Sequence, residues 1–344
     1  MFLSLCFFPH CAFFLQDFSS ILIQDDIASC SSPVSSKTIF GAVLDDGLVS
    51  RSGFGSVINN ALNAYLIANI AEPRRSFQLI NADWSYRSFS SLFRNAPCRI
   101  FLDHPRHSLR LIEEVEEFVL TVNSSSGRIS IVGPEVSAYN YMTRNFQIVR
   151  KIISGIAEDH GKHLVFQTKR AALKLIWNPI DSVRNLTDIL RASLGSYVAV
   201  HIRRGDKVAY GEAEAIGVEK YQQAVMDYCV RAVKCPETVF VMSDDPTAVS
   251  ELRGMLMNFT VVDEEQLFSK AKDVVDGIVE EREGSDEGKR LDARKTVQLV
   301  VGLTIAARAE HVVCTFSSNL CRLIALLNGD LRCCTSLDVE WHPM

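Results

Sequence analysis

The residues with the clearest chemical potential stand at the end of the hydrophobic run 197–202. His201 lies within this run, and Arg203, Arg204 and Lys207, here called the cationic cluster, follow it directly. Such a run is typical of a strand buried on both faces of a parallel sheet, and ligands bind at the carboxyl ends of such strands. Because Arg and Lys bind phosphate oxygens, the cationic cluster predicts a site for a small polyanion such as a diphosphate.

The cationic cluster has two other interpretations. Its arginines could form an internal salt-bridge cluster with Asp206, which would explain them by packing alone. Residues 204–206 also spell Arg-Gly-Asp, a tripeptide that integrins recognise, but a position directly after a buried strand argues against adhesion. Two arginines and a lysine within five residues are hard to explain by packing, so the anion site is the favoured hypothesis.

A later strand end carries polar residues that suit the same site. Ser317, Ser318 and Asn319 separate an expected strand at 311–316 from an expected helix at 320–327. Backbone N–H groups at a helix N-terminus bind phosphate, although Ser and Asn are also ordinary N-cap residues. This turn is therefore expected either to join the anion site or to serve as a plain helix cap.

Acidic residues near the cationic cluster could supply further chemistry. Asp244 and Asp245 follow the expected strand 238–242 and could hold a divalent cation. The cationic cluster could neutralise a diphosphate alone, so we expect no metal and no cofactor. Glu212 is a candidate general base beside fixed positive charge, or else an ordinary solvated loop acid. No Ser/His/Asp triad order and no zinc-binding spacing is evident in the sequence.

Length and charge exclude some functions. The chain has 344 residues and 47% hydrophobic content, which is enough for two domains. Its formal net charge of −5 argues against a nucleic-acid partner. The positive charge of the cationic cluster is therefore local, which favours a small anionic ligand.

Strands and helices alternate along the chain, which predicts an α/β fold with a doubly wound second half. Strands are expected at 77–80, 129–132, 197–202, 238–242, 259–262 and 311–316. Helices are expected at 57–70, 109–120, 141–156, 180–194, 219–233, 247–257, 293–308 and 320–327, and a mobile loop at 270–290. The expected domains are an N-terminal segment with a linker at 1–40, an α/β domain at 41–178, a Rossmann-like nucleotide-binding domain at 179–335 and a tail at 336–344.

The amino-terminal segment has three possible roles. Its first 15 residues are apolar apart from Ser4, Pro9 and His10, and no Lys or Arg precedes Lys37. This stretch is too short to span a membrane, so a secretory signal, a weak membrane anchor and a loosely packed tail are the alternatives. A Ser-rich linker at 29–36 follows it.

Two other features bear on the compartment. Asn123, Asn185 and Asn258 each begin an Asn-x-Ser/Thr sequon. Cys314 and Cys321 flank the strand-to-helix turn and could pair. Together with the apolar amino terminus, these features favour the secretory pathway over a cytosolic protein with free thiols.

Five motifs give the chain a resemblance to the α1,6-fucosyltransferases of glycosyltransferase family 23, and a more distant one to chitin-oligosaccharide and protein O-fucosyltransferases. The motifs are Gly-aromatic-Gly at 53–55, Trp-x-Tyr at 84–86, His-x-Arg-Arg-x-Asp-Lys at 201–207, Asp-Asp-Pro at 244–246 and Cys-Thr-Phe-Ser-Ser-x-x-Cys-Arg at 314–322. Their order and spacing agree with the family over residues 45–330. The family's coiled-coil stem and SH3-like domain have no counterpart within this stretch.

The resemblance implies a two-domain GT-B-like fold with GDP-fucose bound in the cleft, mainly by the second domain. It implies inverting transfer of fucose to a glycan or glycoprotein acceptor in the Golgi lumen, namely the core GlcNAc of N-glycans in α1,6 linkage. The implied catalytic residues are Arg203, Lys207 and Glu212, the last after a one-residue insertion. The implied donor-binding residues are His201, Arg203, Arg204, Gly55, Tyr86, Ser317, Ser318 and Asn319, and the supporting residues are Asp206, Tyr221, Asp244, Asp245 and Arg322.

The resemblance also implies one disulfide, and the sequence differs from the family pattern at one expected ligand-binding position. It implies a disulfide between Cys314 and Cys321. The family has an aspartate that reads guanine at the position of Gly302, so the group expected to select the base is absent from that position. Two alternatives therefore stand beside transfer to N-glycans: a non-catalytic relative that binds nucleotide or glycan, and a fucosyltransferase with a different acceptor.

Overall fold

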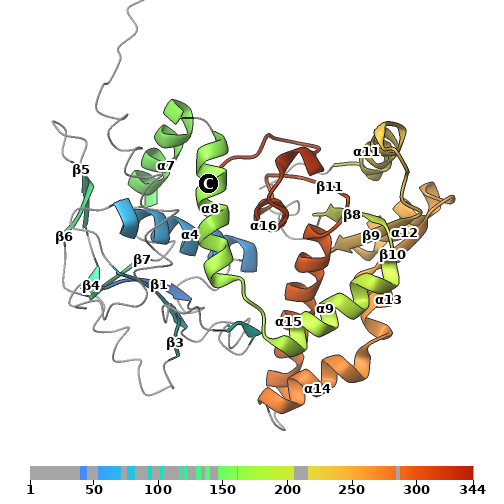
Figure 1. Cartoon of the computed structure of the whole chain (residues 1–344), viewed down its shortest axis with the longest axis horizontal. Coiled ribbons are helices and arrows are strands. Elements are labelled where there is room, and N and C mark those ends of the chain that lie inside the picture. The colour runs from blue at the N-terminus through green and yellow to red at the C-terminus, as the bar shows by residue number, and fades with distance from the viewer. Residues whose placement is uncertain are drawn as a thin grey trace, which may run out of the picture.

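The computed structural model of the chain describes residues 39–44, 53–70, 76–81, 92–94, 101–103, 116–117, 119–122, 129–132, 136–139, 146–160, 162–204, 216–283 and 287–343. Within these ranges the chain forms two five-stranded parallel sheets and one two-stranded hairpin. Helices pack on the sheets, so the predicted α/β class is confirmed. The two sheets lie in opposite halves of the molecule, with helix α8 (Lys162–Ile176) between them (Figure 1).

The first sheet is built from the amino-terminal part of the chain. Its strands run in the order β3-β2-β1-β7-β4, and every neighbouring pair is parallel. The strands are β1 (Ile39–Leu44), β2 (Ser76–Asn81), β3 (Phe101–Asp103), β4 (Glu116–Glu117) and β7 (Val136–Tyr139). A separate antiparallel hairpin joins β5 (Val119–Val122) to β6 (Ile129–Val132).

The second sheet is also parallel throughout and has the order β10-β9-β8-β11-β12. Its strands are β8 (Tyr197–Ile202), β9 (Thr238–Ser243), β10 (Thr260–Asp263), β11 (His311–Cys314) and β12 (Cys334–Ser336). The chain builds outward from β8 to β10 and then returns to the other side of β8 with β11. The sheet is therefore doubly wound, with its topological switch point between β8 and β11.

Two apolar layers bury the second sheet. Along β8, Tyr197 and Ala199 face one layer, whereas Val198, Val200 and Ile202 face the other. This alternation explains why the strand reads as an apolar run. One layer holds α11 (Val218–Arg231) and α12 (Pro246–Met255). The other holds α9 (Asp181–Leu194), α13 (Glu264–Ser269), α14 (Lys272–Glu283), α15 (Glu287–Ala307) and α16 (Asn319–Asn328).

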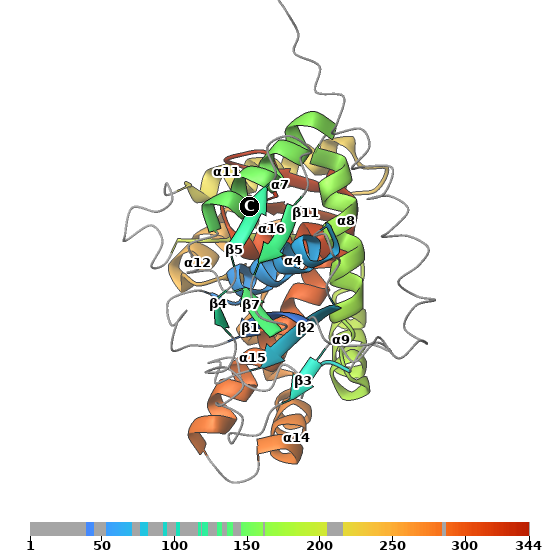
Figure 2. The same ribbon diagram turned by 90° about the vertical axis from the view of Figure 1, so that its left-hand side faces the viewer.

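A continuous core joins the two halves of the molecule. Helix α4 (Phe54–Ile70) packs on β1 and β2 and also contacts α16 and α8. Helix α7 (Phe146–His160) packs against α8 and α4. The view in Figure 2 shows α4 crossing in front of α16, above strands β1, β2 and β7 of the first sheet. The division of the chain at 178/179 stays a prediction.

The last described residues return to the first half of the molecule. After the short 3-10 helix η3 (Leu331–Cys333) and β12, the segment 339–343 packs along α8. Trp341 is buried and its indole packs edge-on against the Phe166 ring, with centroids 5.1 Å apart. The buried Lys169 ammonium donates to the Pro343 carbonyl, and burial lowers its pKa to about 7.

Several predicted elements are confirmed and others were wrong. The strands expected at 197–202 and 238–242 and the helix expected at 180–194 agree closely with β8, β9 and α9. The segment 270–290 is not a loop, because α14 and the start of α15 occupy its described part. The many charged residues of this segment suggested a loop. Val275, Ile278 and Val279 nevertheless recur at helical spacing and form the buried face of α14.

Two parts of the first half also differ from expectation. A helix was expected at 109–120, but β4 and the start of β5 lie there, and pairing of β5 with β6 overrides the helical pattern. Helix α8 and strand β1 were not predicted. Among the described residues, every helix is too short or too polar to cross a membrane.

Gly55 determines how closely the two halves approach. A Cβ built on Gly55 would lie 2.8 Å from the Asn319 carbonyl carbon and 2.8 Å from the Leu320 nitrogen, at the start of α16. The Asn59 side chain crosses the same contact, donating to the carbonyls of Gly55 at 2.9 Å and Asn319 at 3.3 Å. The missing side chain thus lets the first turns of α4 and α16 touch through their backbones.

We expect Gly55→Ala to destabilise the folded protein by about 1–3 kcal/mol, because backbone atoms of α16 must shift to admit the methyl group. Gly155→Ala is the matched control, since Gly155 also lies in a helix and a Cβ there meets nothing within 4 Å. That control should stabilise by about 0.5–1 kcal/mol through helix propensity. Urea denaturation of both variants checks this, and equal effects of the two substitutions would refute it.

Candidate functional site

The candidate site lies at the switch point, where the ends of β8 and β11 diverge. His201, near the end of β8, is only 5% exposed, and its Nδ1 lies 3.0 Å from the Sγ of Cys321 in the first turn of α16. Burial on its own lowers the pKa of His201, but interactions with Cys321, Glu264 and Asp244 outweigh it and raise the pKa. The contact joins the two sides of the switch point and places an ionisable ring there.

Arg203 and Asp244 join the ends of the two neighbouring strands. The Arg203 guanidinium forms an ion pair with the Asp244 carboxylate. The same carboxylate accepts the backbone N–H of Arg204 at 2.9 Å. Asp244 therefore serves as a partner for positive charge. Asp245 caps α12 by accepting the Thr247 N–H at 2.9 Å. Among the described residues, no group of His, Cys, Asp or Glu is arranged to hold a metal.

Arg204 is anchored away from the switch point. Its guanidinium donates to the Ile216 carbonyl, at 3.2 Å from one terminal nitrogen and 3.4 Å from Nε. It also lies 3.4 Å from a Glu251 carboxylate oxygen and 3.8 Å from one of Asp245. These contacts give Arg204 a structural role in holding the chain that follows β8 against α12. Its contact with the donor stays a prediction.

Four of the residues predicted for the site lie outside the described ranges. They are Tyr86, Asp206, Lys207 and Glu212. The structure describes Arg203 and Arg204 from the cationic cluster, and these two arginines have different surroundings. The catalytic roles of Lys207 and Glu212 therefore stay predictions.

The turn before α16 is held by a carboxylate from beyond β12. Asp338 accepts the backbone N–H of Phe316 at 2.8 Å and that of Ser317 at 3.2 Å, and it also accepts the Ser336 hydroxyl at 2.8 Å. Burial on its own raises the pKa of Asp338, but hydrogen bonds from Ser317, Val339 and Ser336 outweigh it and hold the pKa low. Asp338 thus binds two N–H groups of this turn, and sequence analysis did not single it out.

The remaining predicted residues of the turn are largely occupied within the protein. Ser318 is the buried N-cap of α16, but its side chain makes no capping hydrogen bond. The Asn319 Oδ1 accepts from Arg322 and, at 3.4 Å, from Asn59 of α4. Tyr221 is buried and its hydroxyl hydrogen-bonds Thr315, next to the turn. The side chains of Asn319, Arg322 and Tyr221 therefore stabilise the turn through contacts within the protein.

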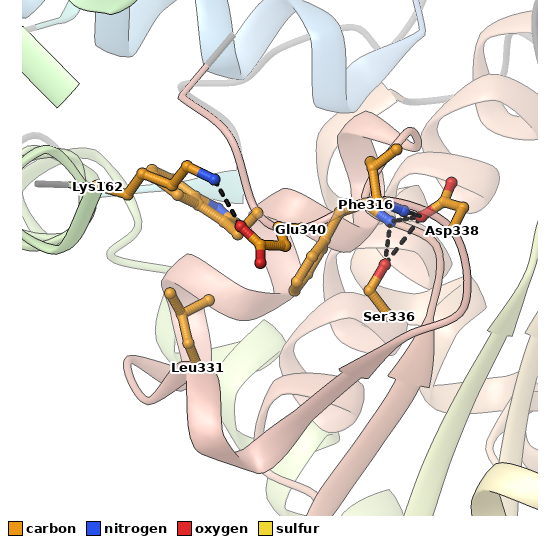
Figure 3. Close-up of a pocket in the computed structure, with 8 residues that line it drawn as sticks. Lys162, Phe316, Leu331, Ser336, Asp338 and Glu340 are labelled. Atoms are coloured by element: carbon orange, nitrogen blue, oxygen red, sulfur yellow. Dashed lines mark hydrogen bonds and ion pairs between the residues drawn. The ribbon is translucent and has the colours of Figure 1, made fainter. Parts of the chain in front are cut away.

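A cavity of about 430 Å³ adjoins this turn. It lies between the turn, the carboxyl-terminal segment and the start of α8, and a Lys162–Glu340 ion pair of 2.7 Å lies at one side (Figure 3). The lining residues are Lys162, Phe316, Leu331, Ser336, Asp338, Val339, Glu340 and Trp341. The carboxyl-terminal segment therefore shapes the surroundings of the turn as well as packing on α8.

The expected disulfide between Cys314 and Cys321 is not formed in the structure. Both are buried free thiols that hydrogen-bond each other. Cys321 is also within hydrogen-bonding distance of His201 Nδ1, so its sulfur joins a thiol–imidazole chain instead of a covalent link. Within the described residues a disulfide joins Cys229 to Cys235, a pairing that was not predicted from the sequence.

Glu264 is a second functional candidate that the sequence analysis missed. It follows β10 directly, and its carboxylate accepts the Ser243 backbone N–H at the end of β9. Burial raises its pKa to about 7, against an opposing effect of His201. The rule that selected Asp244 would have found Glu264 too, because both follow strands of the same parallel sheet.

These contacts define the class of the protein. The site stands at the switch point of a doubly wound parallel sheet, with an ion-paired arginine, a buried histidine and a helix N-terminus around it. Proteins of this class bind nucleotides and other phosphate-bearing ligands at that point.

The chain belongs to the family described as alpha-(1,6)-fucosyltransferase N- and catalytic domains, whose model matches residues 139–327, more than half of the chain. It is 26% identical over 171 residues to an alpha-(1,6)-fucosyltransferase of Drosophila melanogaster. That alignment covers 48% of this chain and 25% of the fly protein. The chain thus spans about a quarter of the length of this relative.

Similar solved structures include two fucosyltransferases. The NodZ fucosyltransferase from Bradyrhizobium is 11% identical with a TM-score of 0.47, covering 84% of this chain and 92% of that one. POFUT1 in complex with GDP-fucose is 10% identical with a TM-score of 0.46, covering 86% and 95%. The family assignment rests on the sequence match, because both TM-scores are below 0.5.

We expect Asp338→Ala to lower the free energy of unfolding by about 1–3 kcal/mol. The Ser317 N–H loses its acceptor, and the Phe316 N–H keeps only the Ser336 hydroxyl, at 3.0 Å. Glu340→Ala, two residues along, is the control, since it removes only an exposed ion pair with Lys162 and should change little. Thermal unfolding at neutral pH measures both. Similar losses in the two variants would show that Asp338 does not hold the turn.

Glu264→Gln should stabilise the folded protein at pH 8 but not at pH 4. A carboxyl whose folded pKa is about 7 against 4.5 unfolded penalises the fold as pH rises through this interval. Replacing it should therefore gain on the order of 2 kcal/mol at pH 8. Melting temperatures across the pH range test this, with exposed Glu265→Gln as control. A gain that does not depend on pH would contradict the assignment.

Proposed function

We propose that the chain transfers fucose from GDP-fucose to a glycan hydroxyl, with inversion at the anomeric carbon. The observation that carries the proposal is the Arg203–Asp244 pair at the switch point, in a chain that belongs to the alpha-(1,6)-fucosyltransferase family. A guanidinium held by a carboxylate is oriented before the ligand arrives, and the planar fork of N–H donors in arginine matches phosphate oxygens. Pre-orientation of this kind favours charge stabilisation in the transition state.

In the proposed reaction, the acceptor oxygen attacks the anomeric carbon of fucose from the side opposite GDP. A new carbon–oxygen bond forms while the bond to the β-phosphate oxygen breaks and GDP departs with the electron pair. Glu212 takes the acceptor proton as general base. Arg203 and Lys207 stabilise the negative charge that develops on the diphosphate, so the reaction needs neither a metal nor another cofactor.

The proposed acceptor is the core GlcNAc of N-glycans, joined in α1,6 linkage, and the proposed compartment is the Golgi lumen. The family description and the name of the fly relative support this linkage. The Cys229–Cys235 disulfide suits an oxidising compartment. The sequons at Asn185 and Asn258 lie at exposed positions, where a glycan could be attached.

Arg203→Ala should lower turnover of GDP-fucose with an N-glycan acceptor by about 10²–10³-fold, because the charge on the leaving diphosphate loses its partner. Release of GDP is measured with a panel of N-glycans, with and without EDTA. Arg203→Lys keeps a charge beside Asp244 and should lose less. Arg332→Ala is the control, because that arginine is exposed and pairs with Asp330 in its own loop.

Wild-type turnover in the Arg203→Ala variant would contradict the proposed mechanism. Loss of wild-type activity in EDTA would show that a metal is required. If the wild-type protein binds GDP in calorimetry but transfers fucose to none of the glycans, transfer to N-glycans is refuted. That result favours a non-catalytic relative or a fucosyltransferase with a different acceptor.

A further inference from the structure

The space beside Gly302 is filled by a carboxylate from another element. Gly302 is buried in α15, and a Cβ built on it would lie 2.9 Å from the Oε1 of Glu264 and 3.2 Å from the Cε of Met242. A side chain at position 302 and the observed Glu264 carboxylate would therefore compete for one volume. An acidic oxygen of α13 therefore lies where a side chain at position 302 would stand.

Glu264 differs from the two acids beside it. Asp263 caps α13 by accepting the Gln266 N–H at 2.8 Å and pairs with Arg253 at 2.7 Å. Glu265 is exposed. Glu264 turns inward instead, toward Gly302 and the Ser243 backbone N–H. Among the described residues no lysine or arginine forms an ion pair with it, and its partners are the Ser243 backbone N–H and the charge of His201.

Glu264 interacts electrostatically with a residue at the switch point. Its charge interacts with that of His201, which lies at the switch point and contacts α16. The carboxylate therefore stands at the carboxyl edge of the sheet, on the side of β9 and β10. A ligand whose phosphates lie against Arg203 could extend another group toward it.

An inward carboxylate of this kind is suited to a planar group with two adjacent N–H donors. Its two oxygens can accept two parallel hydrogen bonds, which adds geometric selectivity to the attraction. Guanine presents such a pair in N1–H and its 2-amino group. Adenine presents an acceptor at N1, and hypoxanthine lacks the 2-amino group.

We propose that Glu264 recognises the guanine base of the sugar nucleotide, with its carboxylate in the volume that a side chain at position 302 would otherwise fill. This inference rests on the proposed function, because it assigns the base of that donor. The raised pKa of Glu264 fits a carboxyl that lacks strong donors until a ligand supplies them.

The test is calorimetry on the full chain with GDP, inosine diphosphate and ADP. The wild-type protein should bind GDP about tenfold to 100-fold more tightly than either of the other nucleotides. Glu264→Ala should reduce that preference to nearly one, chiefly by weakening GDP. Glu265→Ala, its exposed neighbour, is the matched control and should leave all three affinities unchanged.

A double variant tests this shared volume directly. Glu264→Ala combined with Gly302→Asp returns a carboxylate to the same volume from α15 and should restore the preference for GDP. If Glu264→Ala retains the wild-type preference, the assignment of Glu264 is wrong while fucosyl transfer stands. Equal binding of GDP and inosine diphosphate by the wild type overturns it too, even if the variant fails to fold. A wild type that binds no GDP overturns the proposed function and this inference together.

Discussion

The site depends on one carboxylate, that of Asp244. It neutralises Arg203 and holds the backbone of Arg204, so the chain leaving β8 is tied to the chain leaving β9. Two consecutive arginines at a strand end would otherwise repel each other and draw the loop toward solvent. With Asp244 between them, one arginine stays at the switch point while the other is anchored against α12.

Much of the second half could be predicted from sequence because its strands are buried on both faces. Tyr197–Ile202 and Thr238–Ser243 read as apolar runs, and the polar residues after them mark the edge where ligands bind. The first half was less predictable. Its strands are short, and the segment before β5 carries a helical pattern that pairing with β6 overrides.

Other parts of the site depend on contacts between distant residues, which no local pattern records. Glu264 and Gly302 become neighbours only when α15 packs against α13. Asp338 finds the turn before α16 because β12 runs parallel to β11. Cys321 stays a thiol beside His201, although its spacing from Cys314 suggested a covalent link. In each case, the arrangement of the strands and helices brings together residues that are far apart in the sequence.

The packing of the segment 339–343 on α8 has a consequence for how the chain folds. Phe166 and Lys169 lie in the middle of the chain, yet Trp341 and the Pro343 carbonyl contact them from near its end. During synthesis, α8 would emerge with this face uncovered until Pro343, 174 residues after Lys169, had left the ribosome. Contacts of such long sequence separation form late and slow folding. This face of α8 is therefore one that a partly made chain leaves uncovered and that a chaperone would protect.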